Sequence, residues 1–316
     1  MKLKVLIMVM IYEGLIKQTE TMIEKNVTLN EIKYNELEEH AVVTDGVTFP
    51  FMAAILMRSK FLSAGALIEP SWVLTAADSV YLIREASRTV RVRLGSINYR
   101  KGGIVVPVKY IVIHPYFDDE TPGYDLALIR LPEPVRETPT LKSIKMQMFM
   151  QEPDGAHFIV PSWPDPMLFS ESSESELIKS TELIKRLRLL SVTYLHPLDS
   201  KDCKEDLASI GVNTATMMCL DTEGMVDPCS RDFGAPVVLN GLLWGILSTW
   251  TIDDCNSYAP ISAYVSLVSV PNITTWIYST VHGLKWKGTE KKVTNVIHGA
   301  IKIDAVANTR VLNNQS

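Results

Sequence analysis

The stretch Pro228-Cys229-Ser230-Arg231-Asp232-Phe233-Gly234-Ala235-Pro236 carries the most specific signal in this chain. Two further boxes precede it, Val73-Leu74-Thr75-Ala76-Ala77-Asp78-Ser79 and Tyr124-Asp125-Leu126-Ala127-Leu128-Ile129. Any one of these boxes alone would be weak evidence. Three boxes in a fixed order, spread over more than a hundred residues, form a specific pattern that decides the fold.

In chain order, the three boxes resemble the V-L-T-A-A-H-C, D-I-A-L and C-x-G-D-S-G-G-P motifs of the trypsin/chymotrypsin-type serine proteases. The last box keeps its frame at Cys229, Asp232, Gly234 and Pro236. The resemblance implies an all-β fold of two packed six-stranded antiparallel Greek-key barrels with a C-terminal helix.

The ends of this resemblance set the expected domain boundaries. Residues 41–280 form the protease-like domain. Residues 1–40 are expected to be a signal peptide and leader, because a basic start is followed by a short apolar run. An ordinary cytosolic N-terminus is the alternative. Residues 281–316 are expected to be a solvated basic extension, and binding of a polyanion by this tail is the alternative.

The resemblance implies that two of the three catalytic residues are replaced. Phe233 stands at the position of the serine nucleophile, and a phenyl ring has no lone pair with which to attack a carbonyl. Asp78 stands at the position of the histidine, and an ordinary carboxylate is a poor general base for an alcohol. Only Asp125 matches the family, in which this residue orients the histidine. We therefore expect an inactive homologue of a serine endopeptidase.

The oxyanion hole and the specificity pocket of the family map onto residues that also depart from the pattern. The two oxyanion-hole N–H groups would belong to Arg231 and Phe233, and the first position is normally glycine. Asp227 lies where trypsin-like members bind a basic side chain. Trp250 and Ile261 replace the two glycines of the pocket wall, and we expect these bulky side chains to close the pocket.

Asp78 and Asp125 should lie close together if the fold is kept, and three interpretations of the pair stay open. Two carboxylates are able to share a proton, as in the aspartic proteases, or to ligate a hard cation. The third interpretation, which we adopt, is that Asp78 faces solvent without a chemical role. No metal and no cofactor is then expected.

The chain has four cysteines, Cys203, Cys219, Cys229 and Cys255, and their spacing alone leaves all three pairings open. The resemblance implies the pairs Cys203–Cys219 and Cys229–Cys255. Because no cysteine is left over, the pattern favours an oxidising compartment.

Two other disulfides of the family are absent from this chain, and both cysteines of each are replaced. Ser63 and Ser79 occupy the positions of the bridge that flanks the catalytic histidine, and Phe158 and Leu239 those of a bridge in the second barrel. Because both cysteines of each disulfide are replaced, no free thiol is left over, and this supports the alignment of the chain with the family motifs.

Composition excludes little but is consistent with a secreted protein. The 31 basic and 36 acidic side chains give a net charge of −5, which provides no reason to expect nucleic acid as a partner. No apolar run reaches the roughly 20 residues of a membrane span. Candidate glycosylation sites are Asn26, Asn272 and Asn314, each in an N-x-S/T triplet.

Short apolar or alternating runs between turn signals predict strands. In the first half these runs are 51–57, 64–68, 72–75, 90–94, 104–113 and 125–131. In the second half they are 157–160, 187–193, 216–220, 235–239 and 242–249. Residues 165–186 are expected to be an insertion with a short amphipathic helix, and residues 269–277 the terminal helix, with Pro271 near its start.

The function that we expect is binding or regulation without catalysis, as an adaptor, cofactor or decoy in proteolysis. Its protein partner, such as a protease or its substrate, cannot be identified from the residues. Two alternatives remain: a hydrolase that uses an unorthodox site around Asp78 and Asp125, and a structural or storage protein with no specific partner.

Overall fold

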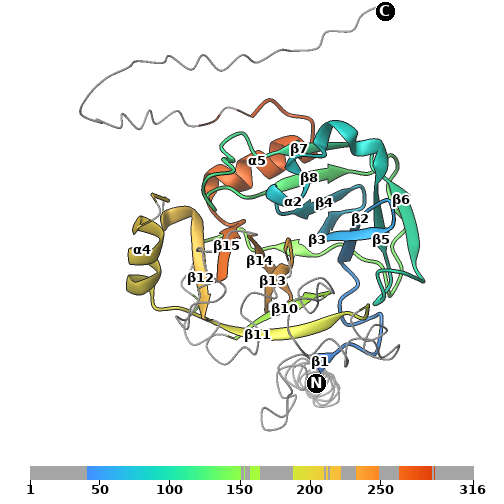
Figure 1. Cartoon of the computed structure of the whole chain (residues 1–316), viewed down its shortest axis with the longest axis horizontal. Coiled ribbons are helices and arrows are strands. Elements are labelled where there is room, and N and C mark those ends of the chain that lie inside the picture. Colours follow the sequence, from blue (N-terminus) through green and yellow to red (C-terminus); the bar gives the residue numbers. More distant parts are fainter. Residues whose placement is uncertain are drawn as a thin grey trace, which may run out of the picture. The chain divides into compact units, whose positions relative to one another are not determined.

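The computed structural model describes residues 41–150, 153, 157–163, 188–209, 211–212, 214–221, 233–248, 263–286 and 288. Its strands form two sheets, one from each half of the described chain, and all pairings except β9–β14 are antiparallel (Figure 1). The compact unit that contains both sheets ends at Trp286, and residues 287–316 form a separate unit.

The first sheet closes on itself as a barrel. Its strand order is β6-β5-β2-β3-β4-β8-β7. The strands are β2 Met52–Met57, β3 Lys60–Glu69, β4 Trp72–Thr75, β5 Val90–Leu94, β6 Ile104–Pro107, β7 Tyr110–Ile113 and β8 Ala127–Arg130. Because β6 and β7 lie at opposite ends of this order but follow each other in sequence, the chain that connects them closes a ring of six strand positions, although β6 pairs only with β5 and β7 only with β8 among the described strands.

The run 104–113, which sequence analysis predicts as one strand, is divided between these two strands. Pro107 ends β6, and its nitrogen carries no hydrogen for a strand ladder. The first part of the run pairs with β5, and the second part pairs with β8. The short link between β6 and β7 therefore connects the two end strands of the sheet.

The second sheet is also a closed ring of six strands. Its order is β1-β11-β10-β13-β14-β15-β12, and an additional pairing of β11 with β12 closes it. The strands are β1 Ala41–Val42, β9 Lys145–Met146, β10 Phe158–Ser162, β11 Ser191–Pro197, β12 Met217–Asp221, β13 Pro236–Leu239, β14 Leu242–Leu247 and β15 Ala263–Leu267. The short strands β1 and β9 add to its edges. The predicted fold of two antiparallel barrels is confirmed, although sequence analysis missed β15.

Strand β2 is apolar on both faces because each face lies in a different core. Ala53 and Ile55 pack inside the first barrel. Met52, Ala54 and Leu56 pack in the core that the two barrels share. Since successive side chains of a strand point to opposite faces, an uninterrupted apolar run satisfies both cores. Strand β2 therefore joins the interior of the first barrel to the junction between the barrels.

The helices lie at the ends and edges of the barrels. They are α2 Asp78–Tyr81, α4 Ser200–Ser209 and α5 Pro271–Val281, with short 3-10 turns η1 Arg84–Thr89 and η2 Thr214–Thr216. Helix α5 confirms the predicted terminal helix, and Pro271 lies in its first turn. In the part of the chain that the structure describes, no helix is both long and apolar enough to cross a membrane.

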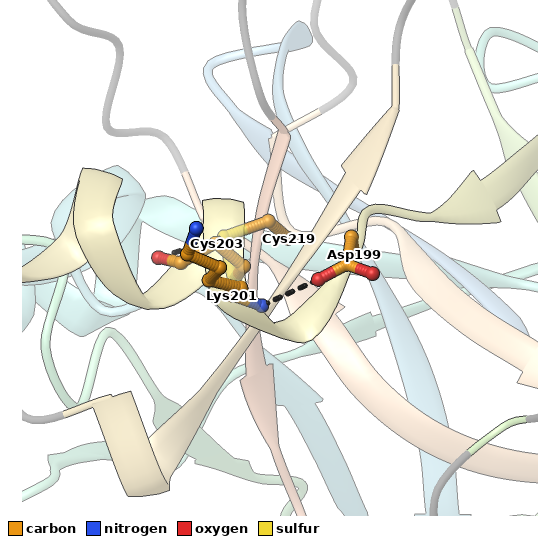
Figure 2. Close-up of a disulfide and its surroundings, with 4 residues drawn as sticks. All are labelled: Asp199, Lys201, Cys203 and Cys219. Carbon is orange, nitrogen blue, oxygen red and sulfur yellow. Dashed lines mark hydrogen bonds between the residues drawn. A yellow bond between two sulfur atoms is a disulfide. The ribbon is translucent and has the colours of Figure 1, made fainter.

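Helix α4 was not predicted, and its first turn is held by a side-chain cap. The Lys201 backbone N–H donates to Asp199 Oδ1 at 2.7 Å, and the Cys203 N–H donates to the Asp199 carbonyl at 3.0 Å. Figure 2 shows this capping bond beside the Cys203–Cys219 disulfide, which ties α4 to β12. This is the cysteine pair that the family resemblance implies. Cys229 and Cys255 lie outside the described residues.

Replacing both Cys203 and Cys219 by Ala is expected to lower the free energy of unfolding by about 3 kcal/mol, because the bridge closes a loop of intermediate length. Urea unfolding followed by fluorescence measures the change. Asp199→Ala, which removes only the helix cap, is the comparison and should cost about 1 kcal/mol. A double variant as stable as the parent would contradict this account of α4.

The residues that replace the two absent disulfides of the family make different contacts. The antiparallel pairing of Ile159 with Val238, continued by one residue, places Phe158 opposite Leu239 on β10 and β13. Phe158 is fully buried in the shared core, so an apolar pair stands where a covalent bond would otherwise be. The Ser63 hydroxyl is hydrogen-bonded, whereas the buried Ser79 hydroxyl has no partner among the described residues.

His114 joins the first barrel to α5 within a group of aromatic rings. Its ring stacks on Tyr124 at 4.7 Å between centroids and meets the edge of Trp276 at 4.6 Å. Nδ1 accepts the Tyr116 N–H at 3.2 Å, while the buried Nε2 has no hydrogen-bond partner among the described residues. Burial lowers the pKa of His114 to about 3, since nothing in this apolar site offsets the loss of water around a charged imidazole.

This buried imidazole predicts a loss of stability in acid. An unfolded histidine takes up a proton near pH 6.5 but the folded one only near pH 3, so protons favour the unfolded chain between these values. The free energy of unfolding should fall by about 2 kcal/mol from about pH 8 to about pH 5 through this residue alone. Urea unfolding at a series of pH values measures it. His114→Asn should remove that part of the pH dependence, and an unchanged slope would contradict the assignment.

Candidate functional site

Asp125 is fully buried at the junction of the two barrels and accepts hydrogen bonds at both carboxylate oxygens. The Asp78 backbone N–H donates to Oδ1 at 2.8 Å, and the Ser248 hydroxyl donates to Oδ2 at 2.7 Å. Asp125 precedes β8 and Asp78 opens α2, both in the first barrel, whereas Ser248 follows β14 in the second. The carboxylate therefore bonds both barrels and holds the start of α2 against the loop before β8.

Asp78 lies three residues after the end of β4, with its side chain exposed and its backbone bound to Asp125. The structure thus brings these two predicted site residues together. Both oxygens of Asp125 accept hydrogen bonds, which favours its charged form over a form that shares a proton with Asp78. Within the described residues, no group of three or more His, Cys, Asp or Glu side chains is arranged to hold a metal ion.

Phe233 is held mainly through its backbone. Its carbonyl accepts the Ala64 N–H at 2.9 Å and the Ser63 hydroxyl at 3.0 Å, and its side chain is half-buried. Ser63 Oγ lies 2.9 Å from Thr75 Oγ1, at the end of β4. Thr75 is three residues before Asp78, so this bonded chain links position 233 to the segment that carries Asp78.

Gly234 allows the turn that places Phe233 there. Its φ is +73°, in the left-handed region that glycine adopts without strain. A Cβ atom at this position would lie 2.3 Å from Ser63 Oγ and 2.4 Å from the Ala64 carbonyl oxygen. The Gly234 N–H donates to the Leu247 carbonyl at 3.0 Å, next to Ser248. Positions 78, 125 and 233 are thus tied to one junction by hydrogen bonds between distant segments.

Sequence analysis missed the side chains that hold this junction. Ser248 was not interpreted, although it lies two residues before Trp250, and Ser63 was interpreted only as the remnant of a bridge. Neither residue stands out by periodicity or charge. The sequence carried a signal at both serines, because a buried serine near a motif carboxylate or a backbone carbonyl is a natural hydrogen-bond donor.

The other predicted site residues cannot be placed. Arg231 of the oxyanion hole and the pocket residues Asp227, Trp250 and Ile261 lie outside the described residues, so the closed pocket remains a prediction. The same holds for the sequons at Asn26 and Asn314. Asn272 is half-buried in the first turn of α5, and the Thr274 hydroxyl of its sequon donates to the Val268 carbonyl at 2.6 Å. Its glycosylation also remains a prediction.

Comparison with known proteins agrees with this geometry. The trypsin family profile matches residues 41–277. A trypsin of Simulium vittatum is 32% identical over 199 residues, which cover 62% of this chain and 73% of the relative. Kallikrein-15 of Saguinus oedipus is 27% identical over 236 residues, which cover 73% of this chain and 86% of the relative.

The solved structures show the same fold. Neuropsin, described as a serine protease expressed in the limbic system of mouse brain, matches with a TM-score of 0.60 at 23% identity, over 77% of this chain and 99% of neuropsin. Two packed barrels with the site residues at their junction define the class of trypsin-like serine protease folds. The chain belongs to the trypsin family.

Proposed function

We propose that this trypsin-family chain is a secreted, non-catalytic protein that acts by binding another protein. The observation that carries the proposal is Phe233, the residue directly before Gly234. In the family motif this position supplies the serine oxygen that attacks the peptide carbonyl. A phenyl ring offers no such atom, so acyl transfer through this position has no nucleophile.

Asp78 gives separate support to the proposal. Its backbone N–H is bound to the Asp125 carboxylate, so the local frame of a triad is kept around a side chain of the wrong chemistry. An exposed carboxylate does not take a proton from an alcohol near neutral pH as an imidazole does. Asp125 then acts as a structural link between the barrels.

The hydrolase alternative rests on an acid–base pair of Asp78 and Asp125. The hydrogen bonds to both Asp125 oxygens disfavour that pair, because donors at both oxygens favour the charged carboxylate over a protonated one. Secretion is supported by the Cys203–Cys219 disulfide, since such bonds persist mainly in oxidising compartments. Binding at loops presented by rigid barrels is the general way in which such a scaffold interacts.

Labelling with a fluorophosphonate probe, together with turnover of a broad peptide library, tests the absence of catalysis. We expect no covalent adduct and no cleavage. The matched control is the double variant Asp78→His with Phe233→Ser, which returns a nucleophile and a base to a frame that keeps Asp125. Cleavage by the parent protein that is abolished in Asp78→Asn would overturn the proposal.

Affinity capture from the protein's native fluid tests binding. If no protein is recovered in a saturable way, the result would favour the storage alternative.

A further inference from the structure

The first barrel carries an accumulation of positive charge that the site at the barrel junction does not use. Residues 84–113 contain seven Lys or Arg side chains and a single acidic one, in a chain whose net charge is −5. The turn between β2 and β3 adds Arg58 and Lys60. We call the following exposed or half-buried cations the basic strip: Arg58, Lys60, Arg88, Arg91, Arg93, Arg100, Lys101 and Lys109.

The strip is continuous because of the strand register. In β5, Val90, Val92 and Leu94 are fully buried inside the first barrel, so the alternate residues Arg91 and Arg93 point outward. The β2–β3 turn, with Arg58 and Lys60, lies beside the start of β5, because Met57 pairs with both Val90 and Lys60. Arg100 and Lys101 lie in the turn that leads from β5 to β6. The cations therefore follow β5 over its whole length.

Hydrogen bonds hold Arg93 in place, and the strip forms no ion pair with an acid within the described residues. Among the described residues, the ion pair in this region joins Arg84 to Glu85 and none involves the strip. Arg93 donates to the carbonyls of Tyr99 at 2.9 Å, of Arg100 at 3.2 Å and of Gly102. These bonds order the turn around a fixed guanidinium but leave its net charge uncompensated.

An apolar side chain is exposed among the same cations. Val105 of β6 is 46% exposed and pairs with Arg93, whereas Ile104 pairs with the buried Leu94 and so lies on the other face of the sheet. Residues that pair directly in an antiparallel sheet lie on the same face. Within the described strands, β6 pairs with β5 on one side and with no strand on its other side. This surface therefore combines charge, the exposed Val105 side chain and an unpaired strand edge.

We propose that the basic strip and β6 together form a docking surface for an extended acidic segment of a partner protein. The inference rests on the proposed binding function and names the chemistry of the partner. A peptide that combines acidic and aliphatic residues satisfies the cations and covers Val105. A sulfated polysaccharide offers charge alone and would leave this side chain in water. An unpaired strand edge suits an extended peptide, which adds to a sheet through its backbone.

Fluorescence anisotropy with a labelled peptide of about twelve residues, repeating Glu-Glu-Leu, tests the surface at low salt and at about 0.15 M salt. We expect saturable binding that weakens as salt rises. The double variant Arg100→Gln/Lys101→Gln should bind about tenfold more weakly, since both side chains are exposed and unpaired with acids among the described residues. The matched control is Lys201→Gln/Lys204→Gln on α4, on the opposite side of the molecule from β6 (Figure 1). This control should change binding by less than about twofold.

A third variant separates the peptide from a polysaccharide. Val105→Ser should weaken peptide binding by about threefold, because it removes exposed apolar contact, and should leave binding of a heparin fragment unchanged. The inference is overturned if the peptide does not bind, if both double variants weaken it equally, or if only the heparin fragment binds. Unfolding curves of all variants establish that they fold. Peptide cleavage by the parent protein would refute the proposed non-catalytic function but would leave the docking-surface proposal standing. Capture of a partner protein without binding of the acidic peptide would refute the docking-surface proposal alone.

Discussion

Gly234→Ala is expected to lower the free energy of unfolding by about 4 kcal/mol or more, because the added methyl group has no space. The Cβ atom would lie within 2.5 Å of Ser63 Oγ, the Ala64 carbonyl oxygen and Thr75 Oγ1. Two of these atoms belong to the network that holds the Phe233 carbonyl. Neither backbone nor buried side chain can retreat without breaking a hydrogen bond, so the whole junction between the barrels must shift.

The matched control for this prediction is Gly241→Ala. Gly241 has the same φ of +73°, but nothing lies within 4 Å of a Cβ built there. It carries the left-handed strain alone, which costs about 1 kcal/mol. Urea unfolding of both variants measures the difference. Equal losses of stability would mean that conformation, and not close packing against Ser63, explains the glycine at position 234.

Asp125→Ala is expected to cost about 3–5 kcal/mol of unfolding free energy, because hydrogen bonds to a buried charged group are worth about 1.5–3 kcal/mol each and the donors are left unsatisfied. The Asp78 N–H and the Ser248 hydroxyl both lose their acceptor. The effect is structural. It should therefore appear in equilibrium unfolding, whether or not the protein has catalytic activity.

Asp125→Asn is the control variant for this second prediction. Its amide oxygen still accepts the Asp78 N–H, and its NH₂ group can donate to Ser248 Oγ, because a hydroxyl oxygen also accepts hydrogen bonds. We expect it to lose less than half of what Asp125→Ala loses. Ser248→Ala should fall between the parent and Asp125→Ala, since it removes one of the two bonds. An Asn variant as unstable as the Ala variant would show that charge, and not hydrogen bonding, is what the site requires.

The boxes predicted the strands around them well because strand patterns are local. The run 90–94 alternates between buried valines and exposed arginines, and its bounds match β5. The run 104–113 was predicted as one strand because its apolar character hides the break after Pro107. Helix α4 was missed because it is short and polar, and its stability comes from the Asp199 cap and the bridge to Cys219. Such contacts leave no periodic signal.

The sequence by itself determined the family frame and the two-barrel fold, and it predicted that Phe233 and Asp78 stand where a protease needs serine and histidine, because these are properties of single positions and short runs. Only the tertiary structure decided what holds those positions together. The bonds from Asp125 to Asp78 and Ser248, and from Ser63 to Phe233, join residues 47, 123 and 170 positions apart. Only the register of β5 and β6 placed Val105 beside Arg93. Partners at such distances are selected by the packing of whole sheets, and no local pattern encodes them.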